Sequence, residues 1–121
     1  MLDSLTDQTL QPDAIYINVP MKNKRTGEAY VIPPLLEAWG GLTIQRTEID
    51  YGPLTKLVPT VMRESDPDTI IIVIDDDQVY TPATLSQLAW YSEQDPNVAW
   101  GICGWSMMPY AYPRGLCCCC C

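Results

Sequence analysis

The chain has 121 residues, with seven basic and fifteen acidic side chains, no histidine and a formal net charge of −8. This length suits one domain with a moderate core and excludes a second full domain. The negative charge argues against a surface that grips nucleic acid through its phosphates. Without histidine, Ser-His-Asp and Cys-His catalysis and imidazole metal sites are excluded, so any chemistry depends on carboxylates, lysine, arginine, tyrosine or a bound metal.

The first half of the chain predicts short alternating helices and strands. An amphipathic helix ends near Gln11-Pro12, and the β-rich residues 14–19 predict a strand that halts at Pro20. A basic loop follows, and then Pro33-Pro34 starts a brief helix over residues 35–39. Residues 42–47 alternate between apolar and polar and predict a second strand.

The second half continues the alternation. Residues 54–64 predict a helix that Pro59 kinks or splits, and residues 70–74 predict a strand. Thr81 and Pro82 are expected as the N-cap and first position of a helix that runs to about residue 93. Residues 98–103 predict a fourth strand. The whole order predicts an α/β layered sandwich with a largely parallel sheet.

The most informative segment joins five β-branched residues, 70–74, to three carboxylates, Asp75, Asp76 and Asp77. An apolar run of this kind predicts a strand covered on both faces, and ligands of parallel sheets bind at the carboxyl ends of the strands. Because successive side chains of an extended segment alternate, Asp75 and Asp77 are expected on one side. Crowded carboxylates favour a hard divalent cation, so we expect Mg²⁺ or Mn²⁺ with Asp75 and Asp77 as ligands.

Residues 73–82 resemble the Asp-x-Asp region of family-two-like nucleotide-sugar glycosyltransferases with the A-type (GT-A) fold. In that family an apolar strand precedes the motif and a proline soon begins a helix. Residues 2–13, with Gln8-Thr9 and Pro12-Asp13, and residues 50–57 are similar to two further passages of the same enzymes. The resemblance implies that residues 1–106 form part of a nucleotide-diphospho-sugar transferase domain.

The resemblance also implies roles for individual residues. The metal would be held by Asp77, with Asp75 near the metal and the ribose of a nucleotide-diphosphate sugar donor. Asp76 and Lys56 are further candidates for donor binding, with Lys56 directed at the diphosphate. Asp50 is expected either to contact the nucleoside or to begin a turn. Tyr51 and Trp105 are candidates for stacking on a base or sugar, or for ordinary packing.

The chain also departs from the family pattern. It begins in the helix after the family's first strand, and the half that binds the acceptor and supplies the catalytic base is missing. We therefore expect a fragment of a glycosyltransferase, with an unknown acceptor and little turnover of its own. Residues 107–121 end in five consecutive cysteines and predict an irregular tail, disordered or artefactual. No apolar stretch of membrane-spanning length and no signal peptide is visible, which leaves the compartment open, the cytoplasm included.

Two other interpretations remain open. One is a non-catalytic metal- or nucleotide-binding remnant, or an acidic interaction module. The other is a phosphatase of the haloacid-dehalogenase type, whose pattern Asp75, Asp77 and Val79 meet formally. In that class Asp75 would be the nucleophile that becomes phosphorylated.

Overall fold

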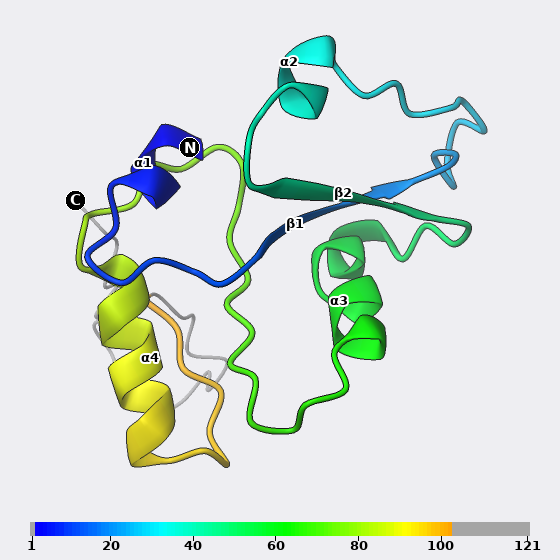
Figure 1. The fold of residues 1–121 in the computed structure, drawn as a ribbon. Coiled ribbons are helices and arrows are strands. Elements are labelled where there is room, and N and C mark those ends of the chain that lie inside the picture. The colour runs from blue at the N-terminus through cyan, green and yellow to red at the C-terminus, as the bar shows by residue number, and fades with distance from the viewer. Residues whose placement is uncertain (1, 103–121) are drawn as a thin grey trace, which may run out of the picture.

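In the computed structural model, residues 2–102 are described, and a two-stranded parallel sheet is the only sheet within them (Figure 1). Strand β1 (Ile15–Pro20) pairs with β2 (Leu42–Thr47) in an unbroken register. The crossover between them contains the short helix α2 (Pro34–Glu37), whose first residue is a proline, as the sequence predicts. The described part of the chain is therefore α/β with parallel strands.

The chain after β2 forms two helical pieces that pack against β1. A 3₁₀ helix, η1 (Gly52–Lys56), is followed by α3 (Val58–Arg63). Of the two outcomes predicted for Pro59, a kink or a split, the structure shows the split. Pro59 lies in the first turn of α3, where its missing N–H costs no hydrogen bond.

Side chains of β1 hold η1 and α3 in place. The amide nitrogen of Asn18 donates to the hydroxyl of Thr60 at 2.9 Å and to the backbone carbonyl of Lys56 at 3.3 Å. The guanidinium of Arg63 lies 4.9 Å from the centre of the Tyr16 ring, which is within the range of a cation–π contact. The end of η1 is therefore fixed from the sheet.

The helix α1 (Leu2–Thr6) and the last helix within residues 2–102, α4 (Thr84–Gln94), meet around Gln8. The Gln8 side-chain carbonyl accepts a hydrogen bond from the N–H of Leu85 at 3.0 Å, and its amide donates to the carbonyls of Ser4 and Thr81, both at 2.8 Å. Gln8 is only 4% exposed. One buried amide thus joins segments that are 73 to 77 residues apart.

The predicted N-cap at Thr81 is wrong, because α4 begins at Thr84 with Ala83 before it. The carbonyls of Thr81 and Pro82 accept hydrogen bonds from Gln8 and from the backbone N–H of Thr9 instead. The helix therefore starts two residues later than predicted, and the carbonyls before it are used in tertiary contacts.

The predicted strand over residues 70–74 is not observed. This segment runs irregularly from the end of α3 toward α1 (Figure 1). A strand inside a parallel sheet needs cover on both faces, but Ile70 and Val73 are 43% and 40% exposed. The N–H and carbonyl of the following residue, Asp75, bond to the hydroxyl of Tyr80 rather than to a neighbouring strand. The backbone of Asp75 is consequently held by a side chain and not by a sheet.

The predicted strand over residues 98–103 is also absent from its described part, residues 98–102. The N–H of Val98 bonds to the carbonyl of Asp95, and the ring of Trp100 lies 5.2 Å from that of Tyr91. The segment therefore folds back onto α4. Cys103, Trp105 and the cysteine tail lie outside the described residues.

We predict that Gln8→Ala lowers the free energy of unfolding by about 1–3 kcal/mol, because the buried N–H of Leu85 loses its acceptor. Chemical denaturation followed by circular dichroism measures this change. Gln11→Ala is the matched control, since the Gln11 amide bonds only to nearby carbonyls at an exposed position, and we expect a change within about 0.5 kcal/mol. Equal effects of the two substitutions would contradict the central role of Gln8.

Candidate functional site

The three aspartates lie on the surface at the end of the irregular segment. Asp76 and Asp77 form a turn, and all three residues are exposed. The prediction that Asp75 and Asp77 lie on one side required an extended chain. Because residues 76 and 77 form a turn, that extended geometry is absent. Contacts with other elements decide how these carboxylates are presented.

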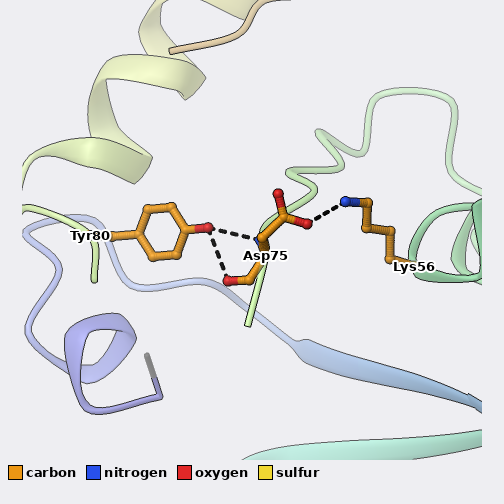
Figure 2. Close-up of polar contacts among 3 residues, drawn as sticks. All are labelled: Lys56, Asp75 and Tyr80. Carbon is orange, nitrogen blue, oxygen red and sulfur yellow. Dashed lines mark hydrogen bonds and ion pairs between the residues drawn. The ribbon is translucent and has the colours of Figure 1, made fainter. Parts of the chain in front are cut away.

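The ammonium of Lys56, at the end of η1, forms an ion pair with the carboxylate of Asp75 (Figure 2). The hydrogen bond to Asp75 raises the pKa of the Lys56 ammonium above its ordinary 10.5, and the charge of Asp77 adds to this effect. The two paired side chains remain 46% and 52% exposed. The structure thus joins two of the predicted site residues and places the third, Asp77, within electrostatic reach of the same lysine.

The hydroxyl of Tyr80 fixes the backbone of Asp75 from the opposite side (Figure 2). It accepts a hydrogen bond from the Asp75 N–H at 2.8 Å and donates one to the Asp75 carbonyl at 3.1 Å. The N–H of Tyr80 in turn donates to the hydroxyl of Ser4 at 3.1 Å. Tyr80 has no role predicted from the sequence, although its position just after the acidic turn was an available signal.

Asp50 organises the loops at the carboxyl ends of both strands. Its carboxylate accepts hydrogen bonds from the N–H of Lys24 at 2.8 Å, the N–H of Gly52 at 2.7 Å and the hydroxyl of Thr55 at 3.4 Å. The N–H groups of Lys24 and Gly52 lower the pKa of the carboxyl below 3.8. Of the two roles expected for Asp50, the structure shows the turn. Its position before η1 makes it part of the support of Lys56.

Asp75 and Asp77 are exposed, and the carboxylate of Asp75 is engaged by Lys56. In residues 2–102 no three carboxylate or thiol side chains gather closely enough to form a metal site by themselves. Mg²⁺ and Mn²⁺ commonly use one or two protein carboxylates, and phosphate oxygens and water complete the shell. Asp75 and Asp77 supply oxygens suited to that arrangement.

Two surface hollows of the described chain are lined by residues other than those of the acidic turn. One is on α4, lined by Ser86, Gln87, Trp90 and Tyr91. Another lies between β2 and α3, and Tyr51 is among the residues that line it. The acidic turn is an open surface, so a ligand there would be held by charge and coordination more than by enclosure. Within residues 2–102, no helix combines the length and apolar character needed to cross a membrane.

A scan against protein-family models finds no match, and searches of the curated proteins and of the solved structures find none either. The chemistry of the site therefore carries the functional argument.

We predict that Asp50→Asn lowers stability at neutral pH and that the difference from the unchanged protein shrinks in acid. A carboxyl whose pKa is lowered in the folded state stabilises the fold above its unfolded value of 3.8 and loses this contribution as the pH falls through the lower folded value. Denaturation at a series of pH values measures the difference. Asp13→Asn removes an exposed carboxylate elsewhere and is the control. A difference that stays constant down to pH 2 would contradict the assignment.

Proposed function

We propose that this chain binds the diphosphate of a nucleotide-sugar donor through Mn²⁺ or Mg²⁺ at Asp75 and Asp77, as the donor-binding part of a GT-A glycosyltransferase. The observation that carries this proposal is the exposed ion pair between Lys56 and Asp75 beside two further carboxylates. A metal–diphosphate complex presents a cation and an anion side by side. The lysine and the aspartates match that pattern of charge.

The ion pair is suited to exchange its partners. Exposed ion pairs contribute only about 0–1 kcal/mol, so separating Lys56 from Asp75 costs little. With a donor bound, the ammonium of Lys56 would face the diphosphate, and the carboxylate of Asp75 would help to hold the metal. Three carboxylates outnumber one ammonium here, and the bound dication removes that imbalance.

Each residue then has one task. Asp77 and Asp75 coordinate the cation, and Lys56 orients the diphosphate and neutralises part of its charge. Asp76 occupies the turn between the two ligands, where it is open to a donor hydroxyl. Asp50 starts η1 and so presents Lys56 from a fixed helix end. When bound, the metal acts as a Lewis acid and stabilises the nucleoside diphosphate as it leaves the sugar.

We predict that the chain binds UDP or GDP more tightly with Mn²⁺ than without it. In Asp77→Asn we expect the metal-dependent part of the affinity to fall at least about tenfold, equivalent to about 1.4 kcal/mol, because a neutral amide is a poor ligand for a hard dication. Isothermal titration calorimetry of the whole chain, with and without Mn²⁺, measures both quantities.

Glu93→Gln is the matched control, because it removes one exposed carboxylate from α4 and leaves the acidic turn intact. It should bind Mn²⁺ and nucleotide as the unchanged protein does. A folded protein that binds neither nucleotide in the presence of metal would overturn the proposed function. Binding without metal dependence would overturn the role of Asp77.

We predict that Lys56→Gln changes the free energy of unfolding by less than about 1 kcal/mol, because the ion pair is exposed. The same substitution should reduce the preference for UDP over UMP in the presence of Mn²⁺, since the ammonium is directed at the second phosphate. Calorimetric titrations with both nucleotides test this. An unchanged preference would place Lys56 outside the donor site.

A further inference from the structure

We infer that the segment of residues 70–74 is a docking strand for an extended peptide with an apolar centre and basic residues at both ends. The segment consists of four isoleucines and one valine, a composition typical of strands, yet the described structure forms no strand there. The inference concerns an interaction surface and is independent of any metal or nucleotide donor.

The backbone of the segment is available for pairing. Within residues 2–102, no N–H or carbonyl group of residues 70–74 makes a hydrogen bond to another protein group. The chain is held on either side of the segment, because the N–H of Thr69 donates to the carbonyl of Asp66 at 3.2 Å and the N–H of Asp75 donates to Tyr80. Unpaired backbone groups between two held ends are what an added β-strand uses.

The side chains of the segment are divided between the body of the protein and the solvent. Ile71, Ile72 and Ile74 are half-buried. Ile70 and Val73 are exposed. The segment is thus packed on the rest of the fold, which matters because two strands without such packing are barely stable in water. An added apolar strand would remove the exposed side chains from water.

Charge decides which strand fits. Asp66 and Asp68 precede the segment, Asp76 and Asp77 follow it, and none of the four takes part in an ion pair among the described residues. Opposite charges directly across two strands stabilise the pair, and like charges destabilise it. Basic residues at both ends of the added strand therefore match this surface. The net charge of −8 also attracts a basic partner from a distance.

A second copy of the segment matches this surface poorly. In an antiparallel pair with the two copies of Ile72 opposite each other, Asp68 of each copy faces Asp76 of the other. A parallel pair in register brings every aspartate beside its own equivalent. Charged residues in such places protect natural strands from pairing with themselves. The occupant that fits is therefore a different chain.

The test uses a synthetic peptide with a valine–threonine centre and a pair of lysines at each end. Calorimetry measures its affinity for the whole chain, and a peptide with glutamates in place of the lysines is the matched control. We expect the lysine peptide to bind at least about tenfold more tightly at low salt. The difference should shrink at roughly 0.5 M NaCl, because salt screens exposed charges.

Hydrogen exchange followed by NMR locates the bound peptide. We expect the N–H groups of alternate residues within 70–74 to exchange more slowly in the complex, because only every second N–H of a strand points to one neighbour. A lysine peptide that is N-methylated at its central amides should not bind, since it lacks the donors for pairing.

A charge substitution in the protein tests the match from the other side. Asp68→Asn should weaken binding of the lysine peptide about twofold to fivefold. It leaves in place the hydrogen bond from the Asp68 N–H to the carboxylate of Asp66. Asp13→Asn removes an exposed carboxylate elsewhere and should leave the affinity unchanged.

The outcomes separate this inference from the proposed function. A folded protein that does not bind the lysine peptide, binds both peptides equally or shows no protection within residues 70–74 would overturn the inference. Sedimentation that shows the protein dimerising, with these same amides protected, would assign the segment to a second copy and overturn it too. No sample contains Mn²⁺ or a nucleotide, so the donor site is tested separately.

Discussion

The buried side chain of Gln8 is the contact on which the rest of the described structure depends. Its side-chain carbonyl accepts a hydrogen bond from the N–H of Leu85 at the start of α4, and its side-chain amide donates to the carbonyls of Ser4 and Thr81. The largely buried apolar side chains of the described region, Leu5 and Leu85, flank this point. Because a buried amide without partners is costly, its hydrogen bonds fix α1, α4 and the loop before α4 as one unit. That unit then holds Tyr80 at the edge of the acidic turn.

A second set of hydrogen bonds connects the strands and their following loops to the end of η1, next to the acidic turn. Asp50 accepts hydrogen bonds from the loop after β1 and from the start of η1, and Asn18 on β1 holds the carbonyl of Lys56. The helix end that carries Lys56 is thus supported from both strands. Asp75 lies where the two sets of contacts meet, bonded to Tyr80 from one side and to Lys56 from the other. The acidic turn is open to solvent, but Asp75, the residue just before it, is held by both sets of contacts.

The differences from the expected fold share one physical cause. Residues 70–74 and 98–102 have the local pattern of strands, but a strand needs a partner and cover for its apolar faces. The described chain supplies neither for the first segment, and Tyr80 takes the backbone groups of Asp75. In the second, Trp100 packs against Tyr91 on α4. In both segments the tertiary contacts outweigh the local propensity to form a strand.

Local patterns along the chain predict the strands β1 and β2, the proline-led α2, the break at Pro59 and the set of charged residues from which a site can be made. These features depend on patterns within a few residues, such as β-branched runs, fixed proline geometry and clustered carboxylates. The way the chain folds back brings Lys56 to Asp75, 19 residues away, joins Asp50 to the N–H of Lys24, and places the hydroxyl of Tyr80 on the backbone of Asp75. Which groups meet depends on how the chain folds back, and neither spacing nor composition encodes that locally.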